Sequence, residues 1–478
     1  MPPLTRQLSR MSIFSWWSDR NAGPTINLHQ FAKPLLRFLH HRQALAIIKR
    51  NRGSPLSVAT LEIYSSYLPW DFVSWSTKAA ILSEIADQTL SSEVDAIAVV
   101  DSPVFPFLPQ MLEADDPGVK SASWRLIGNL AVHESIVSTI LGLQVCGKLV
   151  LLLRHQDSRV VWAATHALSR LARWLDGAKS IVDAQAFHCV LELLASANPE
   201  ARKRTCELVG TLASHAATAP VILELQVSVQ LMCLLHDADP VVVGAAAYAL
   251  SEIAPWLDKE KVSVDAETLG RILELLRSPN SDVRRWTCRL VGRFAQYGLV
   301  ASERQQLNLC SQLVLLLTDS NATVVRIATF ALSQIAAFAA GADAIINAGA
   351  LCYIPELLES TNPRLGMWAC TLITNLARHT PNASALLELD HSITHKLATF
   401  LRNHDNETRD ASSFALDIVI DWLDEASAPT AMDEGLHSIL HPNILDEGRG
   451  VVSWVFLFAW LGHLTHRPCP SFSSGLTP

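Results

Sequence analysis

The stretch from residue 320 to residue 364, SNATVVRIATFALSQIAAFAAGADAIINAGALCYIPELLESTNPR, contains one full period of a repeat that runs through most of the chain. Its two ends, SNAT and TNPR, place Asn321 and Asn362 directly before long apolar helix patterns. Asparagine and aspartate are good helix N-caps, because the side-chain oxygen accepts a hydrogen bond from a backbone N–H of the first turn. Each end of the stretch therefore predicts the start of a helix.

The same cap recurs along the chain, seven times at one constant interval and an eighth time after a slightly longer one. The eight positions are Asp116, Asp157, Asn198, Asp239, Asn280, Asn321, Asn362 and Asp405. Proline follows four of them, at the first helical position, where its missing N–H has no cost. Before each cap lie a Leu-rich helix pattern and a shorter segment such as SIVDAQ, VILELQ or AIINAG. The period predicts an all-α, right-handed α-solenoid of about eight to nine three-helix repeats.

The segment Ala344–Ser360, AIINAGALCYIPELLES, followed by Asn375-Leu376-Ala377, resembles the armadillo repeat consensus. The resemblance covers residues 104–425 and is specific for the fold. It implies an armadillo-type superhelix of the kind found in importin alpha and beta-catenin, with a protein-binding function.

The repeat divides the chain into four expected regions. These are a flexible N-terminal arm at 1–27, a helical cap with a degenerate repeat at 28–103, an armadillo array at 104–435 and a non-repeat tail at 436–478. The tail contains an apolar run, Val451–Leu464, which is shorter than the roughly 17–25 residues that span a bilayer. We expect it to pack on the last repeat, with an interfacial membrane segment or a disordered terminus as the alternatives.

Composition narrows the class of protein. With 478 residues the chain is too long for one core, and with 49% hydrophobic and 18% charged residues it is too apolar to be mostly disordered. A net charge of −8 argues against a nucleic-acid partner. Nine cysteines without metal spacing predict reduced thiols in a cytoplasmic protein, with the nucleus as an alternative. The arm lacks a secretory signal, and its arginines and serines leave a mitochondrial presequence as another alternative.

A second period, twice as long as the first, overlies it. Third helices of one class read like TCELVGTLA, and those of the other like AYALSEIA. Cysteines two repeats apart are too distant to share a metal ion, so we expect core positions for Cys206, Cys288 and Cys370. Tryptophans at equivalent helix ends predict packing between repeats; they are Trp174, Trp256 and Trp422.

No catalytic motif occurs in the sequence: there is no GxxxxGK[ST], GxSxG or HExxH. We therefore expect no enzyme, no cofactor and no metal site. The armadillo resemblance implies instead that third helices line a binding groove through columns of asparagine and tryptophan. Of those two columns this chain keeps only Asn129 and Asn375, so importin-like binding of lysine-rich peptides is not expected.

These two columns, together with a third column one helical turn earlier on the same face, carry a stripe of basic residues in an acidic chain. Arginine pairs bidentately with carboxylate or phosphate. We expect a scaffold or adaptor that binds an acidic or phosphorylated peptide segment along this groove. The alternatives are an importin-alpha-like nuclear transport adaptor and a membrane-peripheral scaffold that uses the tail and the basic helix pattern Leu28–Lys49. The candidate groove residues are Arg125, Asn129, Trp162, His166, Arg170, Lys203, Glu207, Tyr248, Glu252, Arg285, Arg289, Arg293, Arg326, Phe330, Gln334 and Asn375.

Overall fold

The computed structural model describes most of the repeat region. The residues described are 28–51, 56–69, 73–185, 189–257, 265–297, 303–379, 396–397, 399–401 and 405–426. The predicted arm at 1–27 and the tail at 436–478 lie outside them. The chain divides into two compact units, Met1–Leu212 and Ala213–Pro478, and each is considered by itself.

All eight predicted caps are confirmed. Each cap side chain accepts a hydrogen bond of 2.9–3.1 Å from a backbone N–H two or three residues further on. Each bond satisfies one of the N–H groups that a helix leaves without an internal partner. The helices that start there are α8 (Pro117–Leu130), α11 (Ser158–Leu171), α14 (Pro199–Ala213), α17 (Pro240–Ile253), α19 (Ser281–Gln296), α21 (Ala322–Ile335), α24 (Pro363–Ala377) and α27 (Asn406–Ala426).

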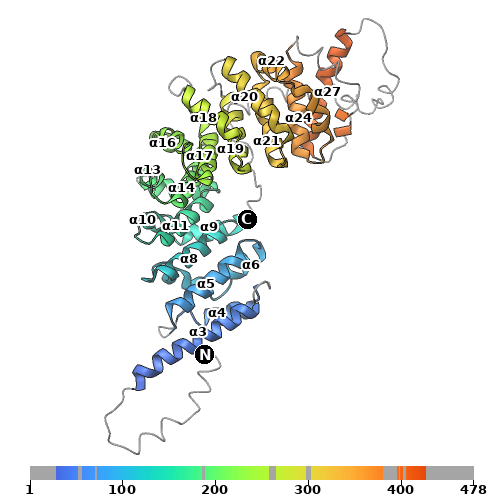
Figure 1. The fold of residues 1–478 in the computed structure, drawn as a ribbon. Coiled ribbons are helices and arrows are strands. Elements are labelled where there is room, and N and C mark those ends of the chain that lie inside the picture. The colour runs from blue at the N-terminus through green and yellow to red at the C-terminus, as the bar shows by residue number, and fades with distance from the viewer. Residues whose placement is uncertain are drawn as a thin grey trace, which may run out of the picture. The chain divides into compact units, whose positions relative to one another are not determined.

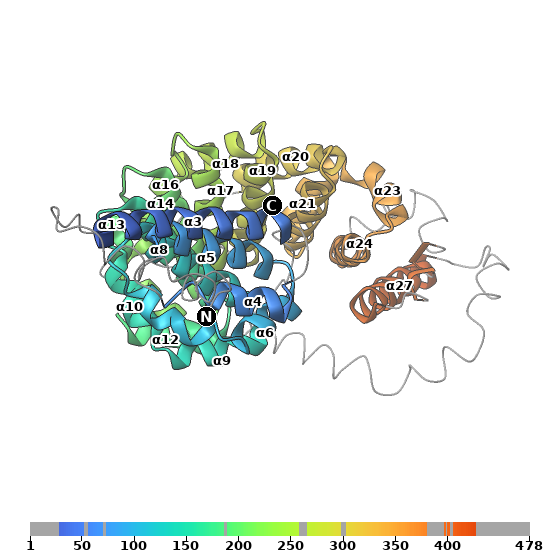
Figure 2. The same ribbon diagram turned by 90° about the horizontal axis from the view of Figure 1, so that it is seen from below.

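In the first unit, third helices lie side by side. Helix α5 (Trp75–Thr89) packs between α3 (Leu28–Asn51) and α8, and α8 packs on α11 (Figure 1). The short first helices α9 (Glu134–Gly142) and α12 (Leu175–Asp183) also lie side by side (Figure 2). The remaining helices are α4 (Val58–Ser65), α6 (Glu93–Val100), η1 (Phe105–Phe107), α7 (Leu108–Leu112), α10 (Val145–Leu152) and α13 (Val190–Leu194).

In the second unit the third helices α17, α19, α21, α24 and α27 pack in chain order; α21, α24 and α27 follow one another in Figure 2. The other helices of this unit are α15 (Ala219–Glu224), α16 (Val227–Leu234), η3 (Ala254–Trp256), α18 (Ala266–Leu276), α20 (Glu303–Leu315), η4 (Leu316–Thr318), α22 (Ala339–Asn347), η5 (Ala350–Tyr353) and α23 (Ile354–Glu359). No strand occurs among the residues that the structure describes.

A left-handed residue separates the first and second helices of four repeats. Gln144, Gln185 and Gln226 have φ of 52–54°, and Gly349 has φ of 78°. They lie in one column, since each precedes the next cap by the same distance in sequence. In the repeats that end at Asn280 and Asn321 the same column falls on Glu267 and Asn308, which lie inside the continuous helices α18 and α20.

The residues predicted to pack between or within repeats do so. Cys206, Cys288 and Cys370 are fully buried, and burial raises the pKa of Cys370 to about 12. The Trp174 indole Nε1 donates to the Ala131 carbonyl at 2.7 Å. The Trp256 indole Nε1 donates to the Ala213 carbonyl at 2.9 Å. The side chain of Trp422 lies outside the described residues. Each of these two tryptophans therefore joins the end of its own third helix to the end of the preceding third helix.

The left-handed column supplies a test of the repeat. Glycine adopts positive φ without the steric cost that glutamine has there, so Gln226→Gly should raise the free energy of unfolding by about 0.5–1 kcal/mol. The matched control is Gln230→Gly, four residues later inside α16, which should lower it by about 1 kcal/mol. Urea unfolding followed by circular dichroism measures both. Equal destabilisation by the two substitutions would contradict the backbone assignment.

Candidate functional site

Asn129 and Asn375, the two asparagines kept from the armadillo column, are buried between third helices. The Asn129 Nδ2 donates to the Ala86 carbonyl of α5 at 2.6 Å. The Asn375 Nδ2 donates to the Ser333 carbonyl of α21 at 2.8 Å. Both residues are at most 5% exposed. These amides thus hold adjacent helices together, in the same way in each unit.

His166 of α11 is buried against Asn129. Its Nε2 lies 3.1 Å from the Asn129 Oδ1. Because that oxygen can only accept, the ring nitrogen donates. The imidazole also stacks on Trp162, with ring centroids 5.2 Å apart. Burial lowers the pKa of His166 to about 3, with help from nearby cations of which Arg170 and Arg204 are the strongest. The ring is therefore neutral at physiological pH.

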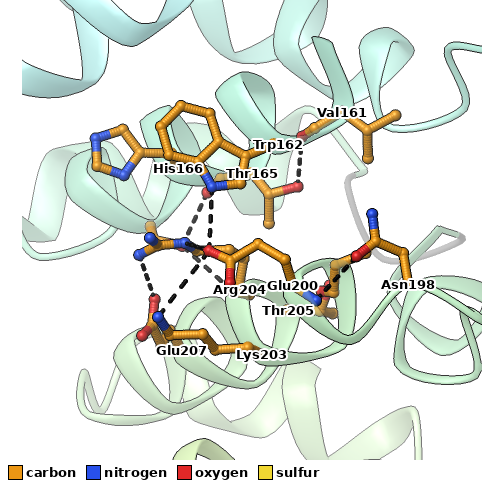
Figure 3. Close-up of polar contacts among 12 residues, drawn as sticks. Val161, Trp162, Thr165, His166, Asn198, Glu200, Lys203, Arg204, Thr205 and Glu207 are labelled. Carbon is orange, nitrogen blue, oxygen red and sulfur yellow. Dashed lines mark hydrogen bonds and ion pairs between the residues drawn. The ribbon is translucent and has the colours of Figure 1, made fainter. Parts of the chain in front are cut away.

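The best-defined polar cluster of the first unit is centred on Glu200, in the first turn of α14 (Figure 3). Its Oε1 accepts hydrogen bonds from the Trp162 indole at 3.1 Å and from the Arg204 Nε at 2.9 Å. The Lys203 ammonium lies 4.0 Å away. A second carboxylate, Glu207, accepts from Arg204 at 3.0 Å. The cluster thus shows an indole N–H and a guanidinium sharing one carboxylate.

The other predicted basic residues of this unit also have partners or are buried. Arg125 pairs with Asp87 at 3.1 Å and donates to the Ser83 carbonyl at 3.0 Å. Arg170 is more deeply placed, and burial lowers its pKa. In the first unit, carboxylates of the chain itself therefore neutralise much of the predicted basic face.

In the second unit aromatic rings join successive third helices. Tyr248 of α17 contacts Trp286 of α19, with ring centroids 4.8 Å apart. Phe330 of α21 meets Trp368 of α24 edge-on at 4.7 Å. All four rings are half-buried. The predicted residues Tyr248 and Phe330 are therefore part of ring pairs, each completed by a tryptophan from the next repeat.

Arginines surround the Trp286 ring. The Arg285 guanidinium lies 4.6 Å and that of Arg289 5.9 Å from the ring centroid, within reach of a cation–π interaction. Arg289 forms an ion pair of 2.5 Å with Glu252, and both side chains are at most 14% exposed. Arg285 pairs at 3.1 Å with Asp282, whose side chain is 70% exposed. Only the second of these pairs is open enough to exchange its carboxylate for that of a ligand.

Two further predicted residues bond within their own helices. The Arg293 Nη1 donates to Gln296 at 2.9 Å, and the Gln334 amide donates to the Ser333 hydroxyl at 3.3 Å. The buried Nε atoms of Arg285 and Arg293 have no hydrogen-bond partner within the part of the chain that the structure describes. Polar groups of this kind carry a desolvation cost, which a bound anion would offset.

Arg326 of α21 lies among other arginines. Burial lowers its pKa, and the charges that lower it further are those of Arg364, Arg285 and Arg289. Positive charge is therefore concentrated between α19, α21 and the start of α24. The second unit brings the predicted Arg285, Arg289 and Arg326 together in this way.

Six residues of these clusters are not among the candidate groove residues. Glu200, Asp282 and Arg364 each lie two residues after a cap, and Arg204, Trp286 and Trp368 each lie six residues after one. Their constant distance from the caps is the sequence signal that could have found them. The asparagine and tryptophan columns alone could not reveal these residues. The partner of a third-helix residue comes from a different column of the next repeat.

Neither ion nor membrane sites stand out in the described part of the chain. No group of three or more histidine, cysteine, aspartate or glutamate side chains there could hold a metal ion. None of its helices is by itself long and apolar enough to cross a membrane. One bent pair, α9 with α10, passes that test by length and composition together.

The buried, neutral His166 predicts a pH dependence of stability. The pKa of His166 is lowered on folding from an ordinary 6.5 to about 3, so the unfolded chain takes up the proton first. The stabilisation is complete above pH 6.5 and is lost as the pH falls toward 3. Replacing His166 with glutamine keeps a neutral donor for Asn129 and removes this titration. Urea unfolding at pH 7 and at pH 4.5 measures the free energy of unfolding that is lost over this interval. The loss should be smaller by roughly 1–3 kcal/mol in His166→Gln than in the native chain. Parallel pH profiles would contradict the neutral assignment.

Comparison with known proteins agrees with the all-helical repeat fold. No protein-family model and no curated protein matches the chain. Among solved structures, an engineered protein determined by the Northeast Structural Genomics Consortium matches with a TM-score of 0.59 and 24% identity, over 76% of this chain and 89% of that one. A designed armadillo repeat protein matches with a TM-score of 0.36 and 21% identity, over 57% of this chain and 99% of that one. The chain has an all-α, armadillo-like solenoid fold.

Proposed function

We propose that this protein is a non-enzymatic scaffold or adaptor that binds an acidic or phosphorylated peptide segment on its third helices. A helical-repeat fold indicates a protein-binding scaffold in general. The observation that carries the finer proposal is the pair of arginines beside Trp286 in the second unit, Arg285 and Arg289, whose charges also act on Arg326. Since the whole chain carries a net charge of −8, this concentration of positive charge favours an anionic partner.

The Glu200 cluster of the first unit supports the same chemistry. There an intramolecular carboxylate is bound by an indole N–H and a guanidinium from adjacent third helices. Charge-assisted hydrogen bonds of this type are stronger than neutral ones. A glutamate or phosphorylated residue of a partner would find the same donor types, tryptophan and arginine, in the second unit.

The importin-alpha-like alternative has less support. Its asparagine column is reduced to Asn129 and Asn375, and both amides donate to carbonyls of the preceding helix. They therefore have their donors engaged in contacts between repeats. We propose a cytoplasmic location with the nucleus as an alternative, to be determined by imaging the tagged full chain.

Peptide binding tests the proposal. A short synthetic peptide of alternating Glu and Ala should bind the full chain at low salt, and the same peptide with Lys in place of Glu should not. The double variant Arg285→Gln/Arg293→Gln removes two guanidinium groups whose Nε atoms have no partner among the described residues. It should weaken binding of the Glu peptide about ten-fold or more, since hydrogen bonds to charged groups contribute roughly 1.5–3 kcal/mol each. Isothermal titration calorimetry measures the affinities.

The matched control is Arg271→Gln/Arg277→Gln, which removes the same charge from α18 and its C-cap instead of a third helix. It should leave the affinity for the Glu peptide nearly unchanged. Equal weakening by both double variants would show that net charge, not this surface, attracts the peptide. Tighter binding of the Lys peptide would favour the importin-like alternative.

A further inference from the structure

Within each unit, two columns of the repeat meet between neighbouring third helices. The residue five positions after one cap lies against the residue two positions after the next cap. In the first unit these are Trp162 and Glu200, joined by the indole-to-carboxylate hydrogen bond of 3.1 Å. The acid suits its place, because a negative charge in the first turn of a helix is stabilised by the helix dipole.

The same two columns meet in the second unit. Between α17 and α19 they are Gly244 and Asp282; a Cβ built on Gly244 would lie 3.9 Å from the Asp282 backbone oxygen. Asp282 is an acid at the position of Glu200, and it pairs with Arg285. An acid thus occupies the second position in both repeats, Glu200 and Asp282, and in both it binds an arginine of its own helix.

Between α21 and α24 the columns hold Arg326 and Arg364, so two cations stand where the first unit has a tryptophan and a glutamate. Of the charges that lower the pKa of Arg326, that of Arg364 has the largest effect. It also lies in the first turn of α24, two residues after the cap Asn362, where the helix dipole disfavours a positive charge. Arg326 therefore stands among cations, and Arg364 extends this positive charge at the start of α24, which suits the binding of an anion.

We propose that Arg326 and Arg364 hold a phosphoryl group of a phosphorylated partner peptide, at the place that the Glu200 carboxylate occupies in the first unit. Arg285 and Arg289 complete the site from α19. This proposal rests on the proposed function and assigns it a ligand class and a position. Its occupant is a phosphorylated side chain in an extended peptide, which lies against the half-buried Trp286 and Trp368 rings.

Charge complementarity favours a phosphoryl group over a single carboxylate. Three guanidinium groups act on Arg326 here, those of Arg285, Arg289 and Arg364. A phosphate monoester carries about −1.5 to −2 charges at pH 7 and three acceptor oxygens, so it can bind several of them at once. It must displace the exposed Asp282 from Arg285, and the higher charge of a phosphoryl group competes better than a second carboxylate. The buried Nε of Arg285 is a further donor, without a partner among the described residues.

Three peptides that differ at one residue test the assignment. They are a Gly-Ala peptide with one central phosphoserine, the same peptide with glutamate there, and the same peptide with serine. The full chain should bind the phosphoserine peptide about ten-fold more tightly than the glutamate peptide, and the serine peptide more weakly still. Arginine side-chain NMR signals of Arg285 should shift on addition of the phosphoserine peptide. Inorganic phosphate, added as a small-molecule competitor, should weaken binding of the phosphoserine peptide.

The decisive variant is Arg364→Glu, which restores at this position the residue type of Glu200. It should abolish the preference for phosphoserine and raise the thermal unfolding midpoint, because an acid replaces a cation in the first turn, where the helix dipole favours negative charge. Arg326→Gln should also abolish the preference. Arg277→Gln, which removes an exposed guanidinium after α18, should change nothing.

Each outcome decides between the possibilities. Unchanged phosphoserine preference in folded Arg364→Glu would overturn the site. Equal binding of the phosphoserine and glutamate peptides, both sensitive to Arg285→Gln/Arg293→Gln, would overturn the phosphoryl assignment and leave the proposed function standing. Tighter binding of a short single-stranded oligonucleotide than of the phosphoserine peptide would overturn the peptide assignment, and binding of none of the peptides would overturn the proposed function itself.

Discussion

The structure depends on one hydrogen bond repeated at a constant interval, from a first-turn backbone N–H to the side chain of the cap. Because the caps from Asp116 to Asn362 are evenly spaced, each third helix starts at an equivalent point. The same side-chain columns then meet in successive repeats. Asn129 and Asn375 donate to equivalent carbonyls in different units, as do the indoles of Trp174 and Trp256. His133 lies in the tryptophan column, and its Nε2 is 3.0 Å from the equivalent carbonyl, that of Thr89.

The two-repeat period has a steric cause. A Cβ added to Gly128 would lie 2.8 Å from the His166 ring, and one added to Gly292 would lie 2.7 Å from the Phe330 ring. One class of third helix therefore carries a glycine that makes room for the ring of the other class.

Sequence alone predicted the helices well and the interactions between them poorly. The caps are local signals, so Asp116 and its seven equivalents located every third helix from α8 onward. The left-handed Gln144 was not foreseen, because glutamine does not indicate positive φ as glycine does. Nor did the ladder columns reveal that His166 is buried and neutral or that Arg289 has a buried carboxylate partner. Those facts depend on which residue of the next repeat reaches each position, and only packing determines that.

Within each unit, equivalent columns meet between neighbouring third helices, and only their residue types differ. A double-mutant cycle applied to the equivalent pairs Trp162/Glu200 and Arg326/Arg364 tests it most directly, by urea unfolding at low salt. We expect a favourable coupling between Trp162 and Glu200 and an unfavourable coupling between Arg326 and Arg364, each on the order of 0.5–1 kcal/mol. A favourable or absent coupling between Arg326 and Arg364 would contradict it.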